Sequence, residues 1–443
     1  MTKGMNRRGV LLGAAVAPFA AISAFAADPV VETSWDTDQV RTMPVPHRYI
    51  HGVMRSHVKF QILLPAAWNG KVAIFTRGFS GTELSTGAFQ TAAVAKGYAF
   101  ASCDEGWRRQ TIADNPQDDY YESRQSLVEL TLYTRALAQT HYGKPASRTL
   151  LIGGSNGGHH TRWMVEAYPR MFDGGISGYG YNSQLTQWGS MAQVARNYDV
   201  IAPRIDDIIA ARAKNARWNP LREPLSPPLT KVQLAALHNI YDIPMPLTGS
   251  VRYNDGRWPG SEAEWKSSYP GLVGYLHDSV PRWDETYRPS GGRPTEEEVR
   301  LWNPLNSPAY VQIDLRREDC NGHLARPLII MHGAADPIVS PGEAEGYKNL
   351  VARTIGPAEA EKLLAVYYIP GMGHGGKHFD DLLPAQIDAL EAMIDYQQSN
   401  GSGGAKAPTF IGSYPREPVT GPGNSLGTYN HASRARKYSA GHR

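Results

Sequence analysis

One segment constrains the fold more than any other: residues 148–158, RTLLIGGSNGG, where a short apolar run leads directly into Gly-x-Ser-x-Gly. The run predicts a buried strand, and residues 159–168 predict a helix. The serine is Ser155, with Gly153 and Gly157 two positions to either side. A serine between a strand and a helix lies on a sharp, strained turn, so these two neighbours must be small. We therefore predict that the Ser155 hydroxyl stands above the edge of a sheet.

A phosphate-binding glycine loop is the alternative for a strand, glycine and helix in succession. The segment has neither the G-x-G-x-x-G pattern nor a Walker lysine, which favours a nucleophile. A serine needs a base, and with this turn the chain order is Ser, Asp or Glu, then His. Asp336 follows the apolar run 326–331, and His374 follows the run 364–369. Because parallel strands end at one edge of a sheet, we predict a catalytic triad of Ser155, Asp336 and His374.

An oxyanion hole should complete this site. We predict one donor in the backbone N–H of Asn156 and a second in the glycine-rich loop 78–80, with Phe79 N–H as the chosen candidate. We expect no metal and no cofactor, because the chain has no Cys and His spacing typical of a metal site.

Five further titratable residues lie near these motifs in the sequence. A histidine just before Gly-x-x-Asp, His332, is predicted to make a structural hydrogen bond. His159 and His160 begin the predicted helix and could face either the site or solvent. Asp104 and Glu105 are reserve acids that the triad order disfavours.

Apolar runs alternate with helical patterns along most of the chain. Strands are expected at residues 49–65, 71–76, 98–102, 148–152, 174–178, 326–331 and 364–369, and helices at 120–142, 159–168, 342–355 and 384–397. This alternation predicts a mostly parallel central sheet covered by helices on both faces. With the serine turn, it predicts an α/β-hydrolase fold.

The rhythm breaks in the middle of the chain, in a Pro-rich stretch with six of the ten tryptophans: Trp188, Trp218, Trp258, Trp265, Trp283 and Trp302. We interpret this stretch as a large inserted cap, or lid, over the carboxyl edge of the sheet. The expected organisation is a signal peptide (1–27), the first part of the core (28–183), the cap (184–320), the second part of the core (321–398), and a linker and tail (399–443).

The first 27 residues have the pattern of an export signal: Lys3, Arg7 and Arg8, an apolar run, and an Ala-x-Ala site at 24–26. The paired arginines suggest the twin-arginine route, with Sec export as the alternative. We predict an exported protein, periplasmic or secreted, without a membrane anchor. Residues 1–27 hold three of the 45 Lys and Arg and none of the 42 Asp and Glu, so the rest is formally neutral and offers no argument for a nucleic-acid partner. The two cysteines, Cys103 and Cys320, could be free or bonded, and the sequence does not fix the oligomeric state.

The chain resembles the tannase and feruloyl esterase family of α/β-hydrolases. The resemblance spans most of the mature chain and is carried by short motifs in the family's order: YGKP at 142–145, GGSNGG at 153–158, EAYP at 166–169, FDGGI at 172–176, LT and QLAAL at 229–237, HG and DP at 332–337, and PGMGH at 370–374. It implies the same triad and an ester of an aromatic acid as substrate. The family typically places bridged cysteines just before the serine and just after the histidine, where this chain has Gly154 and Gly375. A calcium loop that some family lids carry is not expected, because no Asp-rich run precedes Leu229.

The sequence thus predicts an exported serine esterase that cleaves carboxylic esters of aromatic, hydroxycinnamate-like or gallate-like acids, or of bulky apolar acids. A secreted serine peptidase with a prolyl-oligopeptidase-like nucleophile turn is one alternative. A non-catalytic binding protein on the same scaffold is the other. The expected partner is a small or oligomeric ester, with no nucleic acid.

Overall fold

The computed structural model describes residues 33–54, 58–79, 81–105, 120–214, 218, 220–241, 244–245, 250–251, 273–274, 276–277, 280–281, 284, 286–333, 336, 338–369 and 372–399. The predicted signal peptide, the tail from residue 400 onward, and Trp258, Trp265 and Trp283 lie outside this part of the chain.

The core of the fold is a nine-stranded sheet with the order β1-β2-β3-β5-β4-β6-β7-β10-β11. Its strands are β1 (Thr33–Arg41), β2 (His47–Met54), β3 (Lys59–Pro65), β4 (Lys71–Thr76), β5 (Ala99–Cys103), β6 (Arg148–Gly154), β7 (Gly174–Gly178), β10 (Leu328–Gly333) and β11 (Leu364–Ile369). The first three strands pair antiparallel, as do β3 and β5, and all later pairs are parallel. Parallel pairing brings the carboxyl ends of β4, β6, β7, β10 and β11 to one edge, as predicted.

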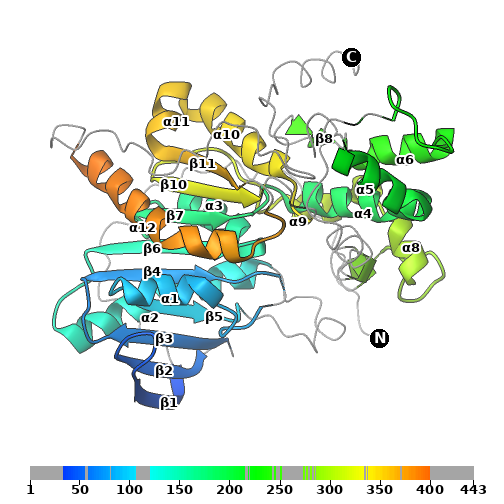
Figure 1. Ribbon diagram of the computed structural model, residues 1–443. Helices are drawn as coiled ribbons and strands as arrows, with labels where there is room; N and C mark the ends of the chain where they lie inside the picture. Colours follow the sequence, from blue (N-terminus) through cyan, green and yellow to red (C-terminus); the bar gives the residue numbers. More distant parts are fainter. Residues whose placement is uncertain are drawn as a thin grey trace, which may run out of the picture. The chain divides into compact units, whose positions relative to one another are not determined.

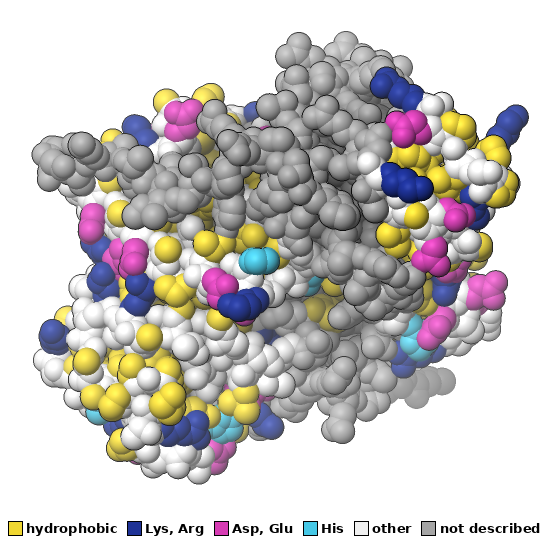
Figure 2. All heavy atoms as spheres, in the orientation of Figure 1, with side chains coloured by type: hydrophobic (Ala, Val, Ile, Leu, Met, Phe, Trp, Pro, Cys, Tyr) yellow, Lys and Arg dark blue, Asp and Glu magenta, His cyan; other side chains and the backbone are white. Residues whose placement is uncertain are grey.

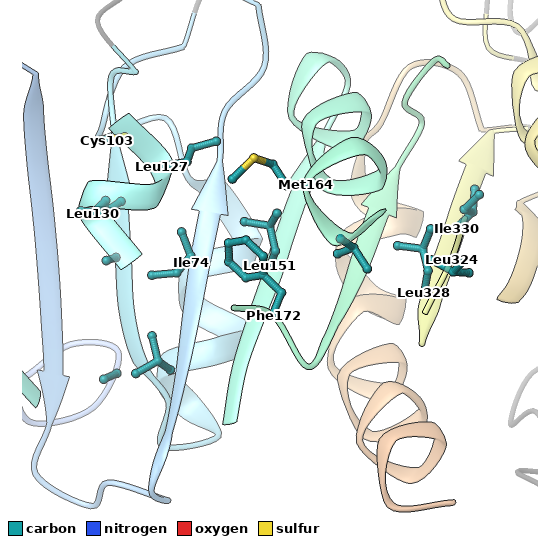
Figure 3. Packing of buried hydrophobic residues seen from close by; sticks show 14 of the residues in the cluster. Ile74, Cys103, Leu127, Leu130, Leu151, Met164, Phe172, Leu324, Leu328 and Ile330 are labelled. Carbon is teal, nitrogen blue, oxygen red and sulfur yellow. The ribbon is translucent and has the colours of Figure 1, made fainter. Parts of the chain in front are cut away.

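Helices cover both faces of the sheet (Figure 1). One face packs against α2 (Tyr120–Tyr142), α3 (Asn156–Ala167), α10 (Pro341–Ile355) and α11 (Pro357–Leu363), and the other against α1 (Gly87–Ala95) and α12 (Lys377–Gln398). Neighbours on one strand serve opposite faces, so that Leu151 of β6 packs near Met164 (Figure 3) while Leu150 belongs to the other apolar cluster. Burial on both faces explains why these strands read as continuous apolar runs.

The segment between β7 and β10 has an apolar core of its own. Its elements are α4 (Gln184–Ile201), η1 (Ala202–Arg204), α5 (Ile205–Lys214), α6 (Lys231–Tyr241), a small antiparallel pair β8 (Pro244–Met245) and β9 (Ser250–Val251), α8 (Glu296–Leu301), η4 (Pro304–Asn306) and α9 (Ala309–Leu315). Trp188, Trp218 and Trp302 are buried in this cluster, and Phe79 from the loop after β4 packs against it. The three described tryptophans of this insertion therefore pack in its core, and this core also contacts Phe79 from a loop of the sheet.

Two helix boundaries differ from the prediction. Helix α3 begins at Asn156, not His159, because Ser155 already serves as its N-cap and the glycines after it take helical conformation. Helix α12 begins at Lys377 and continues through Pro384, whereas Pro384 was predicted to start it. The extra turns bury Phe379 and Leu383, and this burial offsets the cost of an interior proline.

The described surface carries charges of both signs (Figure 2), and the two cysteines lie beneath it. On the face shown in Figure 2, the described basic and acidic side chains are interspersed. No helix within the described ranges is long and apolar enough to cross a membrane. Cys103 and Cys320 are both buried and free.

Candidate active site

Ser155 occupies a strained turn at the end of β6. Its backbone has φ 59° and ψ −122°, a conformation that non-glycine residues seldom adopt, and its N–H donates to the Gly178 carbonyl at 2.9 Å. A Cβ on Gly157 would lie 2.0 Å from the Thr76 carbonyl oxygen, and one on Gly153 would lie 2.6 Å from that same oxygen. The close approach of β4 therefore explains why small residues are required on both sides of the serine, and Gly153 and Gly157 meet that requirement.

The three residues of the predicted triad lie together although 219 positions separate the first from the last. The hydroxyl of Ser155 donates to Nε2 of His374 at 2.8 Å, and Nδ1–H of that imidazole donates to Oδ2 of Asp336 at 2.8 Å. The other carboxylate oxygen, Oδ1, accepts the backbone N–H groups of Ile338 and Val339 at 2.9 and 3.0 Å. The Asp336 side chain is fully buried and that of His374 is 18% exposed, so the imidazole bridges a buried charge and an accessible hydroxyl.

His332 makes the structural hydrogen bond that was predicted. Its Nε2 donates to the Val339 carbonyl at 2.8 Å and lies 3.7 Å from the Asp336 carboxylate. Burial lowers the pKa of His332 to about 4, so the ring is neutral at physiological pH.

This buried imidazole should make stability depend on pH. The ordinary pKa of histidine is about 6.5. Below that pH, His332 is protonated in the unfolded chain but stays neutral in the folded protein until about pH 4. The free energy of unfolding therefore falls as the pH falls toward 4. We expect the native protein to lose roughly 2 kcal/mol more than His332→Gln between pH 7 and pH 5. Urea unfolding at pH 7 and pH 5 measures the loss in the free energy of unfolding, and His378→Gln serves as an exposed control. Equal losses in the native protein and in His332→Gln would contradict the prediction.

The reserve acids have other partners. Oε1 of Glu105 accepts from the Thr76 hydroxyl at 2.8 Å and from Arg77 N–H at 3.0 Å. Burial alone would raise the pKa of Glu105, but Arg77 and His160 hold it below its ordinary value. Asp104 accepts the Lys59 N–H at 3.2 Å. Asp104 and Glu105 therefore hydrogen-bond to other groups, and Asp336 is the acid that contacts His374.

His159 and His160 face neither the cavity nor solvent, the two positions the sequence left open. Both belong to α3 and are buried. The His159 ring stacks on Tyr181 with 4.4 Å between centroids, and its Nε2 lies 3.5 Å from Glu318. Nδ1 of His160 lies 3.3 Å from Glu105. Together they form a buried polar layer that ties α3 to the inserted segment.

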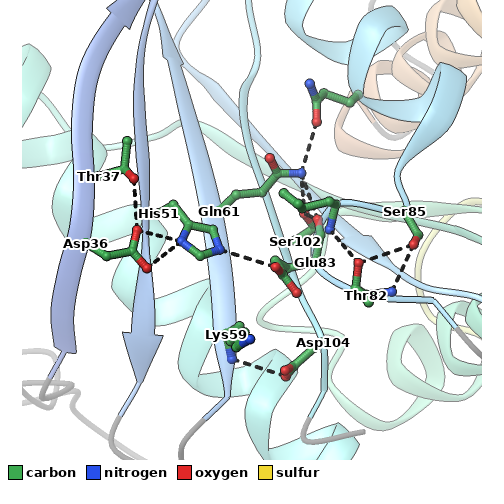
Figure 4. Close-up of polar contacts among 12 residues, drawn as sticks. Asp36, Thr37, His51, Lys59, Gln61, Thr82, Glu83, Ser85, Ser102 and Asp104 are labelled. Atoms are coloured by element: carbon green, nitrogen blue, oxygen red, sulfur yellow. Dashed lines mark hydrogen bonds and ion pairs between the residues drawn. The ribbon is translucent and has the colours of Figure 1, made fainter. Parts of the chain in front are cut away.

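The loop between β4 and α1 is anchored from beneath by a polar cluster (Figure 4). The carbonyl of Glu83 accepts from Gln61 Nε2 at 2.7 Å and from the Ser102 hydroxyl at 2.6 Å. Its side chain lies 3.2 Å from Nε2 of His51, whose Nδ1 lies 2.7 Å from Asp36. Strands β1, β2, β3 and β5 thus fix a loop that lines the cavity next to Ser155.

A cavity of about 390 Å³ opens at Ser155 and His374. Six aromatic side chains contribute to its lining: Phe75, Phe79, Phe89, Tyr179, Tyr181 and Trp188. The volume suits a small organic ligand, and the aromatic walls suit an apolar or aromatic group. Asp380, on the first turn of α12, is the one acid among the lining residues that the structure describes.

Both predicted oxyanion donors lie at this cavity. Asn156 is the first residue of α3, where backbone N–H groups have no acceptor within the helix. Its side-chain oxygen accepts from the Tyr181 hydroxyl at 2.5 Å, which orients the residue. Arg77 donates to the Phe79 carbonyl at 3.0 Å and so fixes the second loop. Over the described ranges, no three His, Cys, Asp or Glu residues are grouped in a way that could hold a metal ion.

Sequence reasoning missed part of the lining, namely Phe89, Tyr179, Tyr181 and Asp380. Tyr179 could have been found, because it directly follows β7 at the same sheet edge as Ser155. The others come from helices or loops whose placement only the folded chain reveals.

Comparison with known proteins relates part of this chain to a family. Residues 46–215 match the family model "Tannase and feruloyl esterase". A probable feruloyl esterase B of Aspergillus niger is 23% identical over 87% of this chain and 80% of its own length. These matches support the tannase and feruloyl esterase family for this chain.

Solved structures agree with this resemblance at the level of the fold. Feruloyl esterase B from Aspergillus oryzae superposes with a TM-score of 0.55 at 17% identity, covering 78% of this chain and 80% of that one. Tannin acyl hydrolase from Aspergillus niger gives a TM-score of 0.51 at 14% identity, covering 83% and 82%. The predicted α/β-hydrolase fold is confirmed, and the comparisons support the predicted family and its enzyme class, a carboxylic ester hydrolase. The roles of single residues, the substrate and export stay predictions.

Proposed function

We propose that this protein is an exported serine esterase that hydrolyses esters of aromatic acids through an acyl-enzyme on Ser155. The observation that carries the proposal is the hydrogen-bonded series Ser155, His374 and Asp336, which opens onto an aromatic-lined cavity. The feruloyl esterase and tannin acyl hydrolase names of its relatives support the same substrate class.

In the proposed mechanism the Ser155 oxygen attacks the ester carbonyl carbon while Nε2 of His374 takes the hydroxyl proton. The carbonyl oxygen becomes an oxyanion, held by the N–H groups of Asn156 and Phe79. Collapse breaks the bond to the alcohol oxygen, which leaves with the proton from His374. Water then repeats the sequence on the acyl-enzyme, releasing the acid and restoring the serine.

The rest of the organisation is part of the proposal. We assign residues 184–320 as the cap, because Trp188 from α4 meets Phe79 edge-to-face, with 5.3 Å between ring centroids, at the cavity wall. We assign residues 1–27 as the export signal on their sequence pattern alone.

A direct test is covalent labelling combined with a substrate panel. We expect a fluorophosphonate probe to modify Ser155, located by mass spectrometry. We expect kcat/KM for methyl ferulate or methyl gallate to exceed that for an aliphatic methyl ester by at least about tenfold, since aromatic contacts add binding energy. Faster cleavage of a peptide anilide than of any ester would instead indicate a peptidase, and a folded protein that neither reacts with the probe nor turns over would indicate a binding protein.

The acid at the cavity rim should discriminate against charged substrates. Asp380 carries a negative charge when ionised, and it would repel an aromatic ester with a second, ionised carboxylate. We expect Asp380→Asn to raise kcat/KM for such an ester about threefold at pH 8 and low salt, with little change for methyl ferulate. Asp388→Asn, an exposed acid on the same helix, is the control. Equal effects on both esters would contradict the assignment.

A further inference from the structure

Tyr179 contacts the chain segments that carry the three triad residues. It follows β7, and its backbone N–H donates to the Met331 carbonyl of β10 at 2.7 Å, on the strand that leads to Asp336. Its φ of 37° lies in the left-handed region, which costs free energy for a bulky residue. The neighbouring structure therefore holds this residue in an unfavourable conformation at the edge of the site.

The ring of Tyr179 fills the space between the serine turn and the histidine loop. A Cβ on Gly154, just before Ser155, would lie 2.5 Å from the Tyr179 hydroxyl oxygen and 2.7 Å from Cζ. A Cβ on Gly375, just after His374, would lie 3.1 Å from the same two atoms. Gly154 and Gly375 thus leave room for one aromatic ring from opposite sides.

The same ring supports the imidazole directly. Tyr179 meets His374 edge-to-face with 4.8 Å between centroids, and it meets Phe379 of α12 at 5.2 Å. The phenol is partly buried, and burial raises its pKa, so it stays neutral at physiological pH. Its contribution is therefore one of packing.

The histidine loop needs such support. Gly375 and Gly376, which follow His374, have φ of 83° and 114° and add no side chain to hold the loop in place. A displacement of about 1 Å at a reacting group can lower a rate about 100-fold. We propose that Tyr179 is a positioning residue, a non-covalent clamp that holds His374 in hydrogen-bonding reach of Ser155. This inference rests on the proposed function.

The first test compares three variants in the full chain. We expect Tyr179→Phe, which keeps the ring, to retain kcat within about threefold, and Tyr179→Ala to lose about 100-fold in kcat with a smaller change in KM. Tyr367→Ala is the matched control, since it removes a buried tyrosine ring from β11 outside the cavity. It should lower the urea midpoint comparably while keeping kcat within about threefold. The clamp is rejected if Tyr179→Ala keeps kcat as the control does, or if Tyr179→Phe loses as much as Tyr179→Ala.

The second test is a double-mutant cycle between Gly154 and Tyr179. In the native background, Gly154→Ala must displace the Tyr179 ring, and we expect a fall in kcat of about tenfold. In a Tyr179→Leu background, with the ring gone, the same alanine should cost less than about twofold, because contacting residues are not additive. Equal losses in both backgrounds would overturn the clamp. Fluorophosphonate labelling of Ser155 in the native protein separates that result from a failure of the proposed function.

Discussion

Ser155→Ala is expected to lower kcat for an aromatic ester by roughly 10⁵-fold, to a residual rate supplied by the oxyanion hole and substrate binding alone. Alanine removes only the oxygen that attacks the carbonyl. Because Ser155 has no side-chain cap bond to α3 and its N–H still reaches Gly178, the turn should survive. Stability and KM should therefore change little while turnover is lost.

The measurement is initial-rate kinetics on methyl ferulate, with urea unfolding to show that the variant is folded. Ser85→Ala is a matched control, since Ser85 also lines the cavity but bonds only within its own loop, to Thr82. We expect Ser85→Ala to stay within about threefold of the native kcat, as surface-loop changes usually do little. Retention of more than one hundredth of native turnover by folded Ser155→Ala would refute the acyl-enzyme.

Buried strands could be predicted closely from sequence. Strands β4, β7 and β11 begin and end where their apolar runs do, because both faces of each are covered. Strand β1 was missed, since TSWDTDQVR is mostly polar and exposed and owes its order to antiparallel pairing with β2. Its contacts, such as Arg48 with Asp38 at 2.7 Å, lie between residues that no local pattern connects.

The site divides in the same way. Ser155, Asp336 and His374 could be chosen because each follows an apolar run that ends at the carboxyl edge of the sheet, which is a local signal. Tyr181 lacks such a signal: it matters because it stacks on His159 and donates to Asn156, contacts that exist only after the chain folds. A glycine can also indicate where another side chain lies: the missing side chain of Gly154 leaves the space that the Tyr179 ring fills.

Asp336→Asn should lower kcat by about 10⁴-fold without unfolding the protein, because it moves the proton of the neutral His374 ring from Nδ1 to Nε2. The N–H groups of Ile338 and Val339 both donate to Oδ1, so the amide oxygen of asparagine must take that place. Its NH₂ group then faces Nδ1 of the imidazole, where Oδ2 now accepts at 2.8 Å.

An amide N–H directed at Nδ1 favours the tautomer with the proton on Nε2, and that proton points at Ser155. The imidazole can then no longer accept the hydroxyl proton, although all three side chains keep their places. Asp173→Asn is the control, because Asp173 also accepts a backbone N–H, that of Thr149 at 2.8 Å, away from the cavity. A kcat for Asp336→Asn within tenfold of native would mean that the tautomer of His374 does not control the rate, and that another group takes the proton from Ser155.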